Sequence, residues 1–176
     1  GLLCGREDLW ARVTRVQSTW GWSTSPFDCW LALRGLGTLA LRAERSIANA
    51  ADVAAFLEKH AKVERVDYPG LANHADHDLA ARQFARRWGN MVTFHLRGGV
   101  TEAERFIAAA RSIPFCPSLG DLATTLSHPA STSHRSLSTQ ARAALGIGDA
   151  TIRLSIGIES SPAILAALEE GLAAIF

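Results

Sequence analysis

Residues Thr151-Ile152-Arg153-Leu154-Ser155-Ile156-Gly157-Ile158-Glu159 carry an apolar side chain at every second position. This period of two predicts a β-strand with one face in a core, while small polar residues and one arginine occupy the other face. A guanidinium stays charged, and its flat fork of donors fits a carboxylate through two hydrogen bonds. Arg153 therefore either binds an acidic group from outside the strand or forms an ion pair with a neighbouring Asp or Glu.

The composition argues against several classes of partner. The chain has 176 residues, of which 48% are hydrophobic, enough for the core of a single domain. Its 18 basic and 17 acidic residues give a formal net charge of +1 without a basic stripe, so we expect no binding to nucleic acid or membrane surfaces. The sequence contains no run of about 18 to 20 apolar residues and no signal-peptide pattern. The separated cysteines Cys4, Cys29 and Cys116 fit a reducing, cytoplasmic setting.

Methionine and lysine are unusually scarce. Met91 is the only methionine, and Lys59 and Lys62 are the only lysines, both in the polar stretch 58–62. We therefore expect the chain to be a piece of a longer protein. Neither lysine lies in a context that predicts burial for covalent chemistry.

Periodicity, capping residues and turns divide the chain into helices and strands. Helices are predicted over residues 6–19, 26–34, 39–60, 75–84, 101–110, 138–145 and 161–175, and strands over 63–67, 90–96, 124–127 and 151–158. Thr101 and Glu104 are predicted to form a capping box. Because the strands alternate, we expect an α+β fold in which helices, including long N-terminal ones, cover one face of a small, mainly antiparallel sheet.

Two helices carry apolar stripes that we expect to face the core. Residues three and four apart lie on the same side of a helix, which defines each stripe. The predicted stripes are Ala43, Ile47, Ala50, Ala54 and Leu57 in helix 39–60, and Leu165, Leu168, Leu172 and Ile175 in the last helix.

Three other constellations suggest chemistry. His74, His77 and Asp78 could hold the metal of a hydrolase, although aspartates are also favoured for capping at a helix start. His128 and His134 flank a serine-rich stretch but lack the glycine pattern of a nucleophile elbow. Cys116 has no neighbouring base in the sequence, so we interpret it as structural.

Seven short blocks, taken together, carry a more specific signal. Their order and spacing resemble the C-terminal domain of the Cys/Met-metabolism enzymes that use pyridoxal phosphate, such as cystathionine γ-synthase, cystathionine γ-lyase, cystathionine β-lyase, methionine γ-lyase and O-acetylhomoserine sulfhydrylase. The blocks are Ser25-Pro26-Phe27-Asp28, Arg34-Gly35-Leu36 with Thr38-Leu39, Val63-Glu64-Arg65-Val66 with Tyr68-Pro69-Gly70-Leu71, Ser118-Leu119-Gly120-Asp121, His128-Pro129-Ala130-Ser131, Leu145-Gly146-Ile147 and the strand from Ile152 to Glu159.

The resemblance implies roles for three residues. Arg153 would bind the α-carboxylate of the amino-acid substrate, and Ser118 and Leu119 would lie beside that substrate. Pyridoxal phosphate would be held by a lysine upstream of Gly1, so no catalytic, cofactor-binding or metal-binding residue is expected in this chain. The cofactor would promote β- or γ-elimination or γ-replacement on sulfur-containing or homoserine-ester amino acids.

The resemblance also implies an organisation. The chain would be a single substrate-side domain whose residues 1–24 connect to the missing cofactor domain, 25–60 form an interrupted helix and 61–176 form the sheet-and-helix layer. The whole enzyme would be a cytoplasmic homo-oligomer, a tetramer built of dimers, and the isolated chain would be inactive.

The sequence departs from the family pattern at three places, one of which is Trp20-Gly21-Trp22 in the loop before Ser25-Pro26. Pro117 precedes Ser118, where cystathionine-handling members often carry a glutamate, and Asp121 replaces a common second glycine. The departures leave the reaction open among the sister activities. A different class also remains open: a stand-alone interaction module that reuses the fold and docks through Leu2-Leu3-Cys4, Trp20 and Trp22.

Overall fold

The computed structural model describes residues 3–175 and divides the chain into two compact units, Gly1–Ala40 and Leu41–Phe176. In the first unit, α1 (Glu7–Trp20) ends at Gly21, whose φ of 68° favours glycine. The helix α2 (Pro26–Leu36) begins after Ser25, whose hydroxyl oxygen accepts a hydrogen bond from the Asp28 amide. Neither helix contains a buried residue. Residues 1 and 2, including Leu2 of the proposed docking surface, lie outside the described residues.

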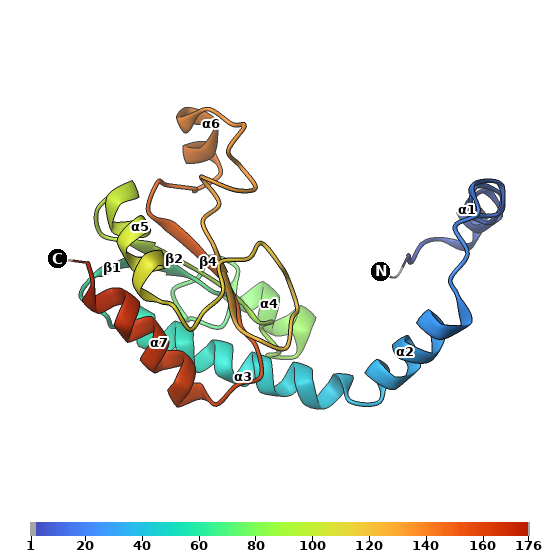
Figure 1. Ribbon diagram of the computed structural model, residues 1–176, viewed down its shortest axis with the longest axis horizontal. Helices are drawn as coiled ribbons and strands as arrows, with labels where there is room; N and C mark the ends of the chain where they lie inside the picture. The colour runs from blue at the N-terminus through green and yellow to red at the C-terminus, as the bar shows by residue number, and fades with distance from the viewer. Residues whose placement is uncertain (1–2, 176) are drawn as a thin grey trace. The chain divides into compact units, whose positions relative to one another are not determined.

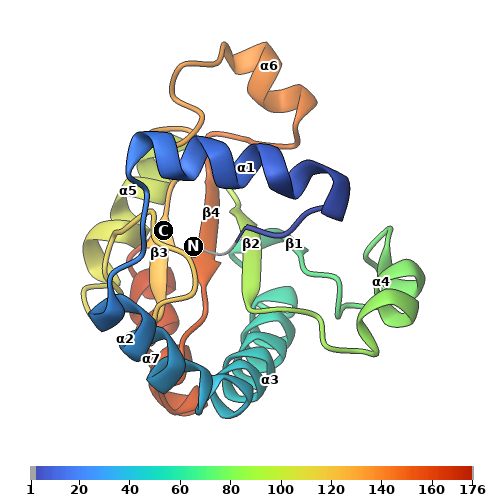
Figure 2. The same ribbon diagram turned by 90° about the vertical axis from the view of Figure 1, so that its right-hand side faces the viewer.

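The second unit contains the sheet and most of the helices (Figure 1). Its neighbouring strands are antiparallel in the order β1-β2-β4-β3, so β4 lies between β2 and β3 (Figure 2). The predicted α+β class is confirmed. The elements are α3 (Leu39–Glu58), β1 (Val63–Asp67), α4 (His77–Phe84), β2 (Met91–Leu96), α5 (Val100–Ala109), β3 (Thr125–Ser127), α6 (Thr139–Ala144), β4 (Thr151–Ser155) and α7 (Ser161–Ala173).

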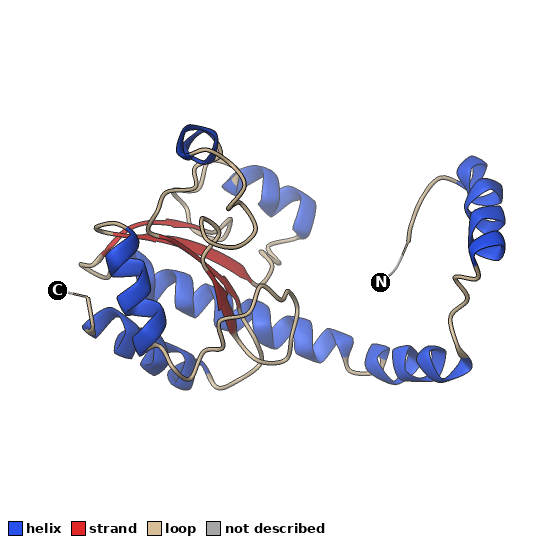
Figure 3. Ribbon diagram, turned by 45° about the horizontal axis from the view of Figure 1, so that its top comes forward, coloured by secondary structure: helices blue, strands red, loops and turns tan. Residues whose placement is uncertain are grey.

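The hydrophobic core joins the apolar face of the sheet to α3, α5 and α7. Figure 3 shows helices packed beside the sheet. Ile152 and Leu154 on β4 are fully buried in this core, as is Phe94 on β2. The ring of Phe94 meets the ring of Phe106 on α5 edge to face, with centroids 5.4 Å apart. Within residues 3–175, no helix is long and apolar enough to cross a membrane.

The strand predicted over residues 151–158 ends earlier, at Ser155. From Gly157 onward the backbone amides leave the sheet, because Gly157 donates to the Thr124 hydroxyl and Ile158 donates to the carbonyl of Leu122. Ile158 is consequently 36% exposed, although the alternation predicted it in the core. The alternation of apolar residues in the sequence therefore continues past the end of the strand.

Three helical details also differ from the predictions. The capping box of Thr101 and Glu104 is wrong: Gly99 is the N-cap, and its amide donates to the Glu102 carboxylate at 2.7 Å. The pair Gly98-Gly99 allows this earlier start, since Gly98 has a φ of 116°. On α3, Ser46 and Asn49 are buried, whereas Ala43 and Ile47 are only partly buried; on α7, Ile164 is buried and Leu165 partly so.

Candidate functional site

Arg153 lies in the middle of β4, on the face opposite the core. The register pairs it with Thr93 on β2 and with Ser127 on β3, so short hydroxyl side chains flank the guanidinium on both sides. Thr93 is paired in turn with Asp67 on β1, which places Asp67 two strands away in the same row. Adjacent strands lie about 4.8 Å apart, so the backbone of Asp67 is about 10 Å from that of Arg153.

The carboxylate of Asp67 is engaged by groups other than Arg153. Its oxygens lie 2.7 Å from His95 Nε2 and 3.0 Å from Arg65 Nε. The other nitrogen of His95 lies 2.9 Å from the Thr151 hydroxyl, which also accepts from the Gly148 amide. Burial alone would raise the pKa of Asp67, but hydrogen bonds from His95 and Arg65 and their charges outweigh it and lower the pKa below its ordinary value. Asp67, the acidic residue in the row of Arg153, is therefore bonded to Arg65 and His95 and not to Arg153.

The Arg153 side chain is partly buried, yet it has no hydrogen-bond or ion-pair partner among residues 3–175. Arg142, which is also partly buried, shows the ordinary alternative: it donates to Asp149 at 2.8 Å and to the carbonyl of Leu137 at 3.0 Å. A guanidinium withdrawn from water needs an anionic or carbonyl partner. Arg153 is thus available to an acidic group that the described residues do not supply.

Ser118 and Leu119 lie in the loop before β3, which hydrogen-bonds to the Arg153 side of the sheet. The Gly120 amide donates to Ser155 Oγ at 3.0 Å. Ser155 is two residues after Arg153, so the two side chains share one face of β4. Ser118 is partly buried and Leu119 is 62% exposed. The bond from Gly120 therefore attaches the loop, next to Ser118 and Leu119, to the face of β4 that carries Arg153.

Sequence reasoning missed the polar residues that hold this loop in place. Glu159 accepts hydrogen bonds from the amide and the hydroxyl of Thr124. Asn49 on α3 donates to the carbonyl oxygens of Gly157 and Glu159. The only signal in the sequence is a polar residue, Asn49, next to an otherwise apolar stripe.

The two histidines of the metal hypothesis make local contacts. His74 Nδ1 accepts from the Asp76 amide at 3.1 Å, and His77 Nδ1 lies 2.8 Å from the carbonyl of Pro69. The His77 ring also stacks on Trp88, with centroids 4.8 Å apart. Across the described residues, no group of three or more His, Cys, Asp or Glu side chains is arranged to hold a metal ion.

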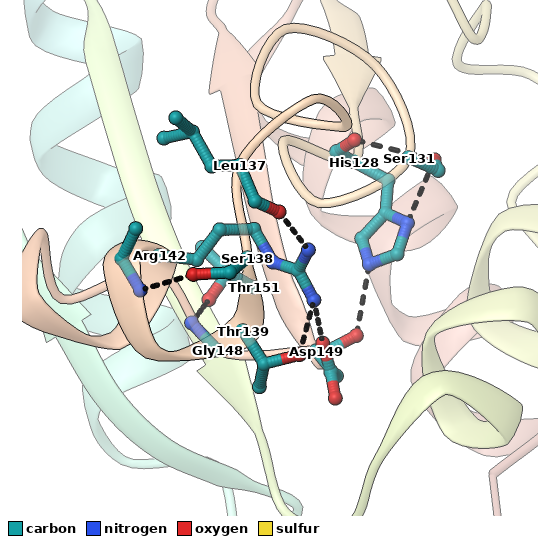
Figure 4. Close-up of polar contacts among 10 residues, drawn as sticks. His128, Ser131, Leu137, Ser138, Thr139, Arg142, Gly148, Asp149 and Thr151 are labelled. Carbon is teal, nitrogen blue, oxygen red and sulfur yellow. Dashed lines mark hydrogen bonds and ion pairs between the residues drawn. The ribbon is translucent and has the colours of Figure 1, made fainter.

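The serine-rich stretch does place a hydroxyl beside a histidine (Figure 4). His128 Nδ1 lies 2.9 Å from Ser131 Oγ, and Nε2 lies 2.8 Å from the carbonyl of Asp149. His128 is only 4% exposed, and both of its ring nitrogens have partners. His134 contacts the adjacent Ser133 instead. These contacts tie residue 128 to residue 149 and support a structural interpretation; Cys116 is partly buried and free.

A family model assigns the chain to a class of enzymes. Residues 1–173 match the model described as Cys/Met metabolism PLP-dependent enzyme. The chain therefore belongs to the Cys/Met-metabolism family of pyridoxal-phosphate-dependent enzymes.

Several individual proteins of known activity are similar to this chain. The chain is 42% identical over 175 residues to an O-succinylhomoserine sulfhydrylase of Pseudomonas aeruginosa, covering 99% of this chain and 43% of that protein. It is 40% identical to a cystathionine gamma-lyase of Dictyostelium discoideum, covering 97% and 44% respectively. A crystal structure of cystathionine gamma synthase from Xanthomonas oryzae pv. oryzae, in complex with cystathionine, superposes with a TM-score of 0.86 at 40% identity, covering 96% of this chain and 43% of that one. The chain thus spans less than half the length of these relatives.

The two lysines of the chain lie outside the strands that surround Arg153. Lys62 Nζ donates to the carbonyl of Leu172 at 2.8 Å, at the end of α7, and Lys59 is exposed after α3. Neither lysine belongs to the strand rows around Arg153.

Proposed function

We propose that this chain forms the substrate-binding wall of a pyridoxal-phosphate-dependent enzyme and that Arg153 binds the α-carboxylate of an amino-acid substrate. The observation that carries the proposal is the partly buried guanidinium of Arg153, which has no partner among residues 3–175. A carboxylate can accept two parallel hydrogen bonds from this group. Membership of the family supports an amino acid as the substrate. The sheet register pairs Arg153 with Thr93 and Ser127, whose side chains are too short to compete with a substrate carboxylate for the guanidinium.

In this proposal, the residues around Arg153 orient the substrate rather than react with it. A bidentate contact fixes the plane of the carboxylate and so the direction in which the α-carbon presents its bonds. Ser118 and Leu119 line the substrate from the adjacent loop. Elimination or replacement at the β or γ carbon depends on the cofactor's capacity to accept electrons, which the rest of the enzyme would supply.

Two loop residues restrict the range of substrates that we propose. Pro117 and Asp121 depart from the pattern of cystathionine-handling members, so we propose methionine or a homoserine ester, rather than cystathionine, as substrate. The measurement is kcat/KM of the full-length enzyme for homoserine esters, methionine and cystathionine. A preference for cystathionine would contradict this part of the proposal.

The isolated chain is proposed to be inactive. With pyridoxal phosphate at neutral pH it should show no stable absorbance band that depends on a lysine, because Lys59 is exposed to water and Lys62 Nζ donates to the carbonyl of Leu172. A band that disappears in Lys59→Ala or Lys62→Ala would contradict this expectation.

Substitution of Arg153 in the full-length enzyme tests the main proposal. Arg153→Ala removes a charge-assisted, bidentate contact, so KM should rise by about 100-fold, a magnitude of ~2.7 kcal/mol. Arg153→Lys keeps the charge but loses the fork and should recover only part of the affinity. Cofactor absorbance should be unchanged in both variants, and Arg111→Ala, at an exposed arginine after α5, is the matched control. A wild-type KM for Arg153→Ala would remove the residue from this role.

A further inference from the structure

The loop of residues 118–124 is bonded at several points to the segment that continues from β4. The Gly120 amide donates to Ser155 Oγ at 3.0 Å, and the Ile158 amide donates to the carbonyl of Leu122 at 2.9 Å. The Gly157 amide donates to Thr124 Oγ1 at 3.0 Å. The segment that begins two residues after Arg153 therefore holds the loop at three points.

Glu159 makes the charged part of this attachment. One of its carboxylate oxygens accepts from the Thr124 amide, and the other accepts from the Thr124 hydroxyl at 3.0 Å. Thr124 is only 2% exposed, so water does not compete freely for these bonds. Glu159 forms no ion pair with a basic residue among residues 3–175. Its carboxylate is committed to the loop alone.

The backbone of Glu159 is itself fixed to the body of the second unit. Asn49, which is 1% exposed on α3, donates to the carbonyl oxygens of Gly157 and Glu159 at 3.0 and 2.8 Å. Glu159 thus connects a rigid helix, through its main chain, to the loop that carries Ser118, through its side chain.

Gly157 leaves the space that this attachment needs. A Cβ atom at this position would lie 2.3 Å from the carbonyl oxygen of Leu122 and 2.6 Å from the carbonyl carbon of Ala123. Both are backbone atoms, so the loop itself would have to move. The close approach of two backbones explains a glycine here without any special φ.

We propose that Glu159 is a positioning residue for substrate binding: acting through Thr124, it holds the 118–124 loop against the face of β4 that presents Arg153. The inference deepens the proposed function and rests on it. The carboxylate of the substrate would contact Arg153, while the loop that Glu159 holds would bring Ser118 to the same substrate. Displacing the loop should therefore weaken substrate binding and leave the cofactor untouched.

Two variants of the full-length enzyme test the attachment. Glu159→Ala removes both acceptors, and Thr124→Val removes only the buried hydroxyl while keeping the shape and the amide. We expect each to raise KM for the amino-acid substrate about tenfold with kcat within about threefold, since the loss is of charge-assisted or buried hydrogen bonds that orient the site. Glu170→Ala, at an exposed glutamate on α7, should behave as wild type. Hydrogen exchange at the Gly120 amide should become faster in both loop variants.

The outcomes separate this inference from the proposed function. A raised KM in Arg153→Ala with a wild-type KM in Glu159→Ala and Thr124→Val would overturn the positioning role alone. A wild-type KM in Arg153→Ala would overturn the proposed function. A loss of kcat, cofactor binding and melting temperature together in Thr124→Val would show a merely structural contact and would also overturn the positioning role. In the double variant Arg153→Ala/Thr124→Val, we expect the rise in KM to be about the product of the two single rises, because Arg153 and the loop contact the substrate separately.

Discussion

Asn49 on α3 donates to the carbonyl oxygen of Gly157 at 3.0 Å, joining residues 108 positions apart in the chain. The same amide nitrogen lies 2.8 Å from the carbonyl oxygen of Glu159. The side chain of Asn49 thus takes over two carbonyl groups that the sheet ladder no longer engages after Ser155. Since Asn49 is only 1% exposed, water cannot replace it readily.

Removal of this amide should be costly. Asn49→Ala leaves buried carbonyl groups without a donor, and we expect a loss of about 2 to 3 kcal/mol in the free energy of unfolding. Asn73→Ala is the control, because Asn73 donates to Glu58 at an exposed position and its loss should cost less than about 0.5 kcal/mol. Urea unfolding of the 176-residue chain measures both values. Equal effects of the two substitutions would contradict the role given to Asn49.

Gly171 permits the contact between α7 and α5. A Cβ atom there would lie 2.7 Å from Cε2 and 2.8 Å from Cδ2 of the Phe106 ring, and Phe106 is fully buried. Alanine gains about 1 kcal/mol of helix propensity over glycine, but crowding a packed core costs about 1 to 3 kcal/mol. We expect Gly171→Ala to lower the melting temperature of the chain. A higher melting temperature would mean that the Phe106 ring moves aside at little cost.

Much of the fold was predictable because most helices and strands are indicated by residues close together in the sequence. The apolar residues of β2 follow from alternation, and the helix at Pro26 follows from a serine cap and a proline, all within a few residues of sequence. The end of β4 was not predictable in this way. It depends on whether the amides of Gly157 and Ile158 find partners in the sheet or in the loop, and those partners lie more than thirty residues away.

The site was predictable only in part for the same reason. Arg153 stands out as a charge on an alternating strand, and the family resemblance supplies its proposed role. Glu159 and Asn49 do not stand out in the sequence. A glutamate after a strand and an asparagine in a helix look like ordinary surface residues until their distant partners are known. The absence of a protein partner for Arg153 among residues 3–175 is likewise a property of the assembled sheet.

The apolar surface of the first unit makes a prediction about self-association. Trp20 and Trp22 are 70% and 65% exposed, with ring centroids 6.0 Å apart. Trp10 and Val16 of α1 and Leu3 contribute to a hollow of about 830 Å³ in the same unit. Exposed apolar patches of this kind favour association in water. Light scattering should show the isolated chain associating with rising concentration.

The variant Trp20→Ser/Trp22→Ser identifies the surface responsible for that association. It should shift the onset to at least about tenfold higher concentration, since each buried aromatic contributes on the order of 1.5 to 3 kcal/mol. Leu145→Ser, which removes an exposed leucine after α6, is the matched control. Association unchanged in the double variant would assign it to another surface and would also weigh against the interaction-module hypothesis.

Asp67 should make the stability of the chain depend on acid pH. Burial raises its pKa, but the hydrogen bonds from His95 and Arg65 outweigh burial and hold the pKa of folded Asp67 below its ordinary value. A lowered folded-state pKa stabilises the fold fully above the unfolded-state pKa, and this contribution disappears as the pH falls through the folded-state pKa.

The stability difference between wild type and Asp67→Asn should therefore be constant from about pH 6 to 5 and shrink below about pH 4. Urea unfolding across this range measures it, with Asp52→Asn, at an exposed position on α3, as the control. A difference that stays constant down to pH 2 would show that the carboxylate charge of Asp67 adds nothing to the fold.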